Sequence, residues 1–188
     1  MTEPDQRVIF YVGGCRSGKS SAALERAQQI DAPRKIFVAT CQPHDAEMRR
    51  RIERHQAERD ASWETIETPI DIVGTIEAHS RPDTVLLVDC LTLWLTNILL
   101  DEVKDAGLEN HFQMLTHSLR HARGPVILVA NEVGLGLVPD NALGRRFRDW
   151  AGSLNQRVAA CAGEVVLTVA GIPMTIKPVA IRGSKACP

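Results

Sequence analysis

Short apolar runs alternate with longer amphipathic segments along this chain of 188 residues. The apolar runs are continuous and strand-sized, which is typical of parallel strands that are buried on both faces. We expect strands at residues 8–12, 35–40, 84–89, 125–130 and 164–169. Helices are expected between them, at about 21–27, 45–59, 91–100 and 141–162, with another in the polar stretch 101–124. This order predicts an α/β fold with a mostly parallel central sheet covered by helices on both faces.

The loop between the first strand and the first helix carries the clearest chemical signal. Residues 13–20 fit the pattern G-x-x-x-x-G-K-[ST] at every defined position, and strand, loop and helix form the context in which it binds phosphate. Backbone N–H groups and the positive end of the helix dipole face the phosphate oxygens. Lys19 would reach the β- and γ-phosphates, and Ser20 would ligate Mg²⁺. The flanking elements favour this nucleoside triphosphate site over an incidental glycine-rich turn. Its residues are Gly13, Gly14, Cys15, Arg16, Ser17, Gly18, Lys19 and Ser20.

Polar residues also end two later strands. Asp89 closes the third strand, where P-loop enzymes place an acid near Mg²⁺. A helix N-cap is the alternative role for this residue. Asn131 and Glu132 end the fourth strand and precede spaced glycines, which indicates either a loop shaped around a ligand or an ordinary strand exit. Ligands of parallel sheets bind beyond the carboxyl ends of the strands, where these residues are predicted to lie.

The charged segment 45–60 contains a histidine at a position of interest. Its five arginines are balanced by five acidic residues, so the arginines alone indicate an ion-paired, solvated helix. Met48, Ile52, His55 and Arg59 share one face of that helix, so His55 is expected to point toward the core or a cleft. These residues alone favour a structural histidine. A neutral imidazole at pH 7 also permits a nucleophile or proton carrier.

Composition argues against nucleic-acid-binding, disulfide-linked, secreted and membrane-spanning classes of protein. A net charge of −1 gives no reason to expect a general nucleic-acid binder. Five scattered cysteines without a C-x-x-C pair indicate reduced thiols and a cytoplasmic protein. The N-terminus is unlike a secretion signal, and no apolar run is long enough to span a membrane. We expect one P-loop domain over residues 1–188, with its core at about 8–177 and a frayed tail at 178–188.

Further motifs follow the P-loop along the chain. They are Ala39-Thr40, Asp45-x-Glu47-Met48, Arg51-Ile52-x-x-His55, Trp63-x-Thr65-x-Glu67, Val88-Asp89-Cys90-Leu91-Thr92, Asn131-Glu132-Val133-Gly134, Val138-Pro139, Arg146-Phe147-Arg148-Asp149 and Gly152-x-x-Asn155-Gln156. Taken in this order, they resemble the bifunctional adenosylcobinamide kinase / adenosylcobinamide-phosphate guanylyltransferase family of cobalamin biosynthesis, and the resemblance covers about residues 8–177. Cys15 departs from the family's usual alanine and Cys41 from its usual small residue, but neither change points to a different activity.

The resemblance implies a RecA-like P-loop fold and two reactions. The first phosphorylates the aminopropanol hydroxyl of adenosylcobinamide with ATP or GTP. The second transfers GMP from GTP to that phosphate, giving adenosylcobinamide-GDP and pyrophosphate, through a guanylylated histidine that corresponds to His55. The family also implies a homo-oligomer, since characterised members form trimers. Its nucleotide contacts correspond to the P-loop and to Ala39, Thr40, Cys41, Gln56, Ala57, Glu58, Arg59, Glu67 and Asp89.

Three other functions share part of this pattern. A P-loop kinase for a small metabolite would have the same first half but would not need a nucleophilic His55. A GTP-regulated switch would normally carry N-K-x-D, which this sequence lacks. A RecA-type ATPase that depends on nucleic acid disagrees with the near-neutral charge. The resemblance ranks the bifunctional enzyme, with Lys19 and His55 as its catalytic residues, above all three.

Overall fold

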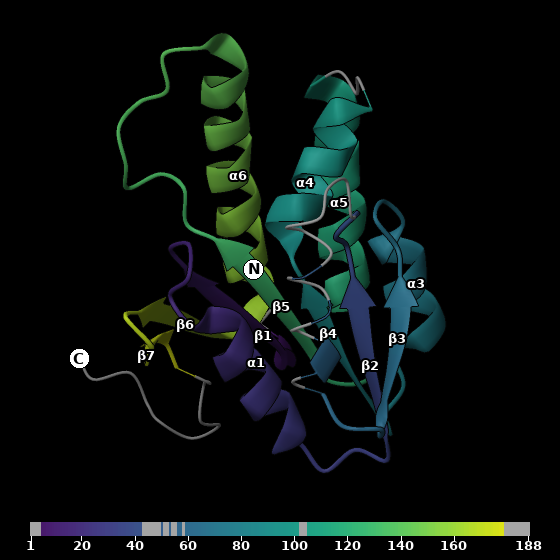
Figure 1. The fold of residues 1–188 in the computed structure, drawn as a ribbon. Coiled ribbons are helices and arrows are strands. Elements are labelled where there is room, and N and C mark those ends of the chain that lie inside the picture. Colours follow the sequence, from purple (N-terminus) through teal and green to yellow (C-terminus); the bar gives the residue numbers. More distant parts are fainter. Residues whose placement is uncertain are drawn as a thin grey trace, which may run out of the picture.

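A seven-stranded sheet forms the centre of the fold, with strand order β3-β2-β4-β5-β1-β6-β7 (Figure 1). The computed structural model describes residues 5–42, 50, 53, 56–57, 59–101 and 105–178. Six strands run parallel, and β7 pairs antiparallel with β6. The strands are β1 (Asp5–Gly13), β2 (Arg34–Ala39), β3 (Trp63–Glu67), β4 (Thr84–Asp89), β5 (Val126–Asn131), β6 (Ala162–Val169) and β7 (Ile172–Lys177).

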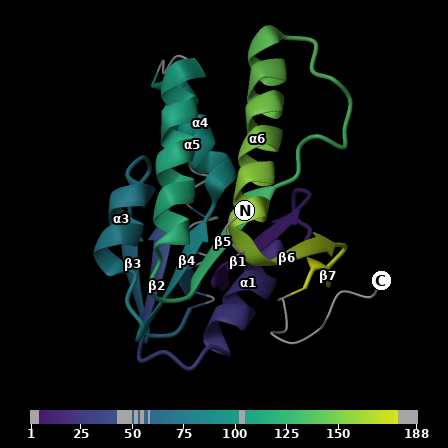
Figure 2. The same ribbon diagram turned by 180° about the vertical axis from the view of Figure 1, so that it is seen from behind.

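Helices cover both faces of the sheet, as the sequence predicted. The helices are α1 (Lys19–Gln28), α3 (Ile72–His79), α4 (Leu91–Leu100), α5 (Asp105–Arg120) and α6 (Ala142–Cys161). α1 covers the face seen in Figure 1, and the other four cover the face seen in Figure 2. α4, α5 and α6 extend beyond the carboxyl ends of the strands, so they form a wall beside that edge (Figure 1). None of the helices within the described residues is long and apolar enough to cross a membrane.

The continuous apolar strands supply two separate cores. On β1, Ile9 and Tyr11 pack toward α1, while Val8, Phe10 and Val12 pack toward the helices on the other face. All five side chains are at most 8% exposed, because successive side chains of a strand point to opposite faces. This two-sided burial is the physical reason why the strands lack polar alternation.

Three elements were not predicted from the sequence. β3 is an edge strand with a mostly exposed, polar pattern, and β7 is an edge strand that is exposed along nearly its whole length. Neither contains the apolar run that marked the other strands. α3 is only eight residues long, and its N-cap residue is Asp71, whose side chain accepts a hydrogen bond from the Gly74 N–H (2.9 Å). The other predicted strands and helices are present, except that the helix at 45–59 and the tail after 178 lie largely outside the described residues.

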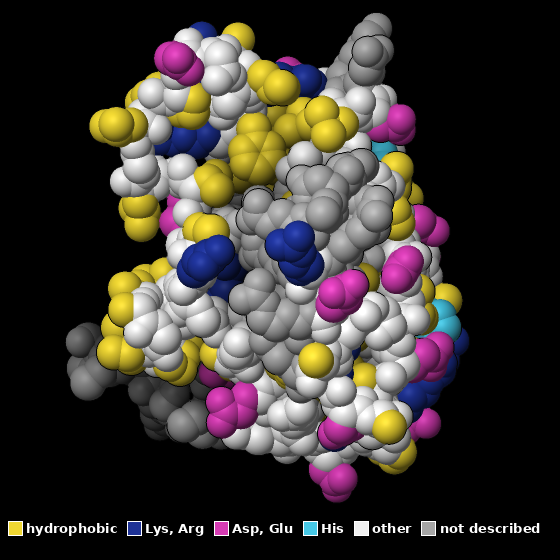
Figure 3. All heavy atoms as spheres, viewed as in Figure 1, with side chains coloured by type: hydrophobic (Ala, Val, Ile, Leu, Met, Phe, Trp, Pro, Cys, Tyr) yellow, Lys and Arg dark blue, Asp and Glu magenta, His cyan; other side chains and the backbone are white. Residues whose placement is uncertain are grey.

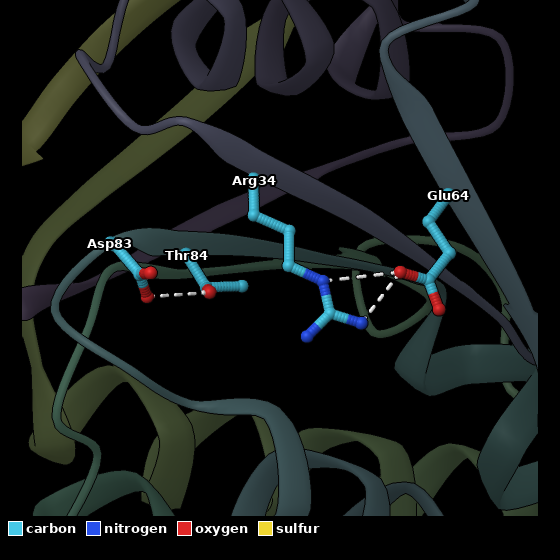
Figure 4. Close-up of polar contacts among 4 residues, drawn as sticks. All are labelled: Arg34, Glu64, Asp83 and Thr84. Carbon is cyan, nitrogen blue, oxygen red and sulfur yellow. Dashed lines mark hydrogen bonds and ion pairs between the residues drawn. The ribbon is translucent and has the colours of Figure 1, made fainter.

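Two polar contacts lie at the amino ends of the strands. Arg34 on β2 forms an ion pair with Glu64 on β3 (Nη2–Oε2 2.6 Å), and the Thr84 hydroxyl donates to Asp83 (3.1 Å) (Figure 4). Arg34 and Glu64 are 44% and 47% exposed, so this ion pair contributes little stability. The ion pair does connect β3 to β2 at the edge of the sheet, where few apolar side chains are buried.

Candidate nucleotide site

The phosphate loop connects β1 to α1 at the carboxyl edge of the sheet. Gly18 has a φ of +90° and is the N-cap residue of α1, a conformation that glycine adopts without steric cost. Arg16 also has a positive φ, of 55°. Lys19 is only 6% exposed, and its ammonium donates to the carbonyl of Gly14 (3.1 Å). The loop therefore places a buried cation and a helix N-terminus together, as an anion site requires.

The hairpin between β6 and β7 supports the phosphate loop from one side. Its Gly171 N–H donates to the carbonyl of Ser17 (2.8 Å). A Cβ on Gly18 would lie 3.2 Å from the Gly171 Cα, and a Cβ on Gly13 would lie 2.4 Å from the Thr168 carbonyl oxygen. These close approaches require glycine in the loop. Thr168 and Gly171 were not predicted as part of the site, because no local pattern indicates that a hairpin about 150 residues further along the chain packs against this loop.

Asp89 ends β4 two strands away from the phosphate loop. It pairs with Ala39 on β2 and with Val129 on β5. Its carboxylate is half-buried and accepts no hydrogen bond from the described residues. The N-cap residue of α4 is Cys90, without a side-chain cap, so the alternative role of Asp89 as N-cap is wrong. The Asp89 carboxylate can therefore bind a ligand at this edge of the sheet.

Thr40 fastens the ends of β2 and β4 together. Its hydroxyl donates to the carbonyl of Cys90 and accepts from the Cys90 N–H, both at 2.8 Å. Its carbonyl accepts from the Asn97 amide (2.8 Å), and the residue is fully buried. Thr40 thus sets the position of its neighbours Ala39 and Cys41. Burial, together with the negative charge of Asp89, raises the pKa of the Cys90 thiol to about 12, so this thiol stays protonated.

Some of the other predicted nucleotide contacts are among the described residues, and some are not. The Arg59 guanidinium lies 3.7 Å over the Phe37 ring and donates to the Thr65 hydroxyl (3.4 Å). Cys41 is half-buried, and Glu67 is exposed at the carboxyl end of β3. Gln56 and Ala57 are helical and exposed, while His55 and Glu58 lie outside the described residues. Among the described cysteines, Cys15 is exposed, Cys41 is half-buried, and Cys90 and Cys161 are buried.

The loop after β5 is held on the other side of the phosphate loop. The Glu132 N–H donates to the Gly13 carbonyl (2.9 Å), and its carboxylate accepts from the Gly134 N–H (2.6 Å). The Arg148 guanidinium on α6 donates to the Gly134 carbonyl (2.6 Å). The Asn155 amide, also on α6, donates to the Asn131 carbonyl (3.1 Å). This network holds the loop against the phosphate loop and α6.

A notch separates this loop from the β6–β7 hairpin on the surface seen in Figure 3. Apolar side chains project on both sides of it. Leu135, Leu137 and Val138 on the loop are 70–97% exposed, and Ile172 and Ile176 on the hairpin are 58–64% exposed.

The donor groups at this edge fit Mg²⁺ bound together with a nucleotide. Ser20 and Asp89 offer a hydroxyl and a carboxylate, the oxygen ligands that Mg²⁺ prefers. Across the described residues there is no group of three or more His, Cys, Asp or Glu side chains that could hold a metal ion. A Mg²⁺ ion here would take its remaining ligands from phosphates and water, which is its usual behaviour in kinase sites.

The sheet, the phosphate loop and Asp89 define a P-loop nucleoside triphosphatase-type fold with its nucleotide site at the carboxyl edge. Solved structures agree with this fold. The assembled ATPase EscN of the enteropathogenic E. coli type III secretion system is 12% identical, with a TM-score of 0.56 over 87% of this chain and 43% of that chain. The P-loop fold predicted from the sequence is thereby confirmed.

Sequence relatives identify the family within this class. A family model described as "Cobinamide kinase / cobinamide phosphate guanyltransferase" matches residues 9–176, and the chain belongs to that family. The bifunctional adenosylcobalamin biosynthesis protein CobP of Pseudomonas aeruginosa is 44% identical over 168 residues, 89% of this chain and 96% of that protein. The bifunctional protein CobU of Salmonella typhimurium is 39% identical over 182 residues, 90% of this chain and 99% of that protein.

Proposed function

We propose that this protein carries out two successive steps of adenosylcobalamin biosynthesis. It phosphorylates adenosylcobinamide with ATP or GTP, and then transfers GMP from GTP to the phosphate, giving adenosylcobinamide-GDP and pyrophosphate. The observation that carries this proposal is the family match across residues 9–176, together with a completely formed phosphate loop. We further propose that both reactions use one nucleotide-binding domain. A small-metabolite kinase without guanylyl transfer remains the alternative.

In the kinase step the phosphate loop binds the triphosphate and stabilises the charge that moves during transfer. The loop N–H groups and the α1 dipole would face the phosphate oxygens. The Lys19 ammonium would neutralise charge on the β- and γ-phosphates, while Ser20 and Asp89 would hold Mg²⁺. Bound Mg²⁺ supplies further neutralisation of the phosphates. Burial of Lys19 supports this role, since a buried cation interacts strongly with an anion.

In the guanylyl step His55 is the proposed nucleophile. Its neutral imidazole forms a bond to the α-phosphorus of GTP, and the bond from that phosphorus to the α–β bridging oxygen breaks. Pyrophosphate leaves toward the phosphate loop. A phosphate oxygen of the corrinoid substrate then attacks the same phosphorus, and the imidazole is released. Covalent catalysis of this kind divides one difficult transfer into two easier ones.

The remaining proposed contacts surround the nucleotide away from its phosphates. They are Ala39, Thr40, Cys41, Gln56, Ala57, Glu58, Arg59 and Glu67. Two observations support them. Ala39 and Cys41 flank the threonine that is fastened to β4, and Arg59 is packed on Phe37. We also propose a homo-oligomer, a trimer by family resemblance, and the exposed apolar side chains of β7 support an interface there.

Labelled GTP tests the proposal directly. After incubation with GTP carrying label in the α-phosphate, the denatured protein should retain label that is lost in acid and survives base, as a phosphoramidate does. GTP labelled in the γ-phosphate should leave no such label on the protein. Adenosylcobinamide phosphate should remove the α-label and yield adenosylcobinamide-GDP. A kinase-only enzyme would phosphorylate adenosylcobinamide without any covalent α-label.

A further inference from the structure

Glu132 is an acidic residue whose backbone is bonded to the phosphate loop, and it has no role in the steps described above. Its N–H donates to the carbonyl of Gly13 (2.9 Å), the first residue of the loop. It follows β5, which lies between β4, the strand that ends in Asp89, and β1, the strand that leads into the loop. Glu132 therefore stands between the proposed metal side of the site and the phosphate side.

Comparison with the other strand-end acids singles out Glu132. In the described part of the chain, Glu67, Asp89 and Glu132 end or follow strands at the carboxyl edge. Glu67 ends β3, which is separated from β1 by β2, β4 and β5, and it is exposed. Asp89 is assigned to Mg²⁺. Glu132 is left as the carboxylate on the strand next to the phosphate loop.

The loop after β5 fixes one carboxylate oxygen and leaves the other available. The Gly134 N–H donates to Oε1 (2.6 Å), and a Cβ at Gly134 would lie 2.8 Å from that oxygen. Arg148 holds the Gly134 carbonyl through Nη2 (2.6 Å), while its Nη1 is buried without a hydrogen-bond partner among the described residues. Within the same residues, no group donates to the second oxygen of Glu132. A half-buried carboxylate with one fixed and one open oxygen is suited to accept a proton.

We propose that Glu132 is the proton acceptor of the kinase reaction, a role that rests on the function proposed above. The substrate hydroxyl oxygen bonds to the γ-phosphorus while the bond from that phosphorus to the β–γ bridging oxygen breaks. The nucleoside diphosphate leaves, and the hydroxyl proton passes to the Glu132 carboxylate and then to water. Guanylyl transfer has a different requirement. Its acceptor is a phosphate whose second pKa is about 6, so at neutral pH the attacking oxygen carries no proton to remove.

The substitution Glu132→Gln separates the two requirements within one protein. It keeps the shape of the side chain and an oxygen for the Gly134 N–H. Phosphorylation of adenosylcobinamide should fall by about 10²–10⁴-fold in kcat, the usual contribution of a general base. Labelling by α-labelled GTP and GMP transfer to adenosylcobinamide phosphate should change by less than a few-fold. That retained activity also demonstrates a folded protein.

Two variants and a pH profile complete the test. Glu77→Gln removes the same charge from an exposed position on α3 and should leave both reactions unchanged. Glu132→Asp keeps the carboxylate and should recover part of the kinase rate. The acid limb of the wild-type kinase pH profile should disappear in Glu132→Gln. If both reactions of Glu132→Gln fall equally, Glu132 only holds the loop in place and the proposal is wrong. An unchanged kinase rate in Glu132→Gln would also overturn the proposal. Wild-type protein that fails to phosphorylate adenosylcobinamide would refute the proposed function itself.

Discussion

The carboxyl edge of the sheet has a phosphate side, at the loop after β1, and a β2 side, at the ends of β2 and β4. Different kinds of hydrogen bond support the two sides. The phosphate loop is supported through the backbone, as in the hydrogen bond from the Gly171 N–H to the Ser17 carbonyl. The ends of β2 and β4 are fastened by side chains, namely the Thr40 hydroxyl on Cys90 and the Asn97 amide on Thr40. Backbone hydrogen bonds survive most substitutions, whereas a side-chain hydrogen bond is lost when that single residue is replaced. The phosphate side is thus sensitive at its glycines, and the β2 side at its polar side chains.

The two sides also differ in the proposed chemistry. Both reactions need a triphosphate bound by the loop, so changes there should affect both. The segment that follows β2 carries His55 and should serve guanylyl transfer alone. The predictions below test this division.

Replacement of His55 should have the largest effect and should act on one reaction. His55→Asn is expected to abolish covalent labelling by α-labelled GTP and to stop guanylyl transfer, because no other group forms the phosphoramidate. Phosphorylation of adenosylcobinamide should survive, since γ-phosphoryl transfer needs no protein nucleophile. Gel autoradiography and product analysis measure the two reactions. A variant that still carries labelled GMP would have another nucleophile, with His44 as the next candidate.

Replacement of Lys19 should affect both reactions together. Lys19→Ala removes the buried ammonium that we propose faces the phosphates, and loss of one such contact costs on the order of 10²–10³ in rate. Steady-state assays of each reaction measure the loss. Lys35→Ala, at the amino end of β2, is the matched control and should retain both activities. Near-normal turnover in a folded Lys19→Ala protein would contradict the assignment of the phosphate loop.

Replacement of Asp89 should change the metal requirement. Asp89→Asn keeps the shape but removes the charge, so the Mg²⁺ concentration for half-maximal turnover should rise by about 10–100-fold, as when other metal-supporting groups are lost. Titration of both reactions with Mg²⁺ checks this. If the titration curve is unchanged, Asp89 has a purely structural role.

Replacement of Thr40 should lower stability. Thr40→Val leaves the Cys90 N–H buried without its partner, while the Cys90 carbonyl keeps the Trp94 N–H as a donor (3.1 Å). An unpaired buried N–H costs about 1–3 kcal/mol in the free energy of unfolding. Denaturant unfolding measures the change. Thr96→Val is the control, because the Thr96 hydroxyl donates only to a carbonyl one turn back in its own helix. If the free energy of unfolding falls equally in the two variants, the Thr40 hydrogen bonds do not stabilise the fold more than an ordinary helix side-chain bond does.

The ionisation of Cys90 should affect stability only in alkaline solution. Its pKa is raised from 9.0 to about 12 in the folded protein, so above pH 9 the unfolded chain releases a proton that the folded chain keeps. The contribution is fully present below pH 9 and is lost as pH rises toward 12, with a slope of up to about 1.4 kcal/mol per pH unit. Cys90→Ala should flatten the unfolding free energy across this range. An unchanged slope would show that the thiol does not titrate differently on folding.

Local patterns were sufficient for the parallel strands, the main helices and the phosphate loop. β4 and β5 are apolar throughout because helices cover both of their faces, so their limits could be read to within about one residue. The loop pattern is contiguous, and its glycines and Lys19 act through their own backbone and charge. The edge strands β3 and β7 escaped prediction because neither carries a continuous apolar run.

The tertiary structure alone decided which distant residues support the site. Only the packed hairpin brings Gly171 against the phosphate loop, and only the strand order places Glu132 beside Gly13. Thr40 remains a proposed nucleotide contact, and the structure adds that its hydroxyl joins β2 to β4. Sequence patterns report the surroundings of a residue along one element. The contacts between elements depend on how strands are ordered in the sheet, and no single stretch of sequence contains that order.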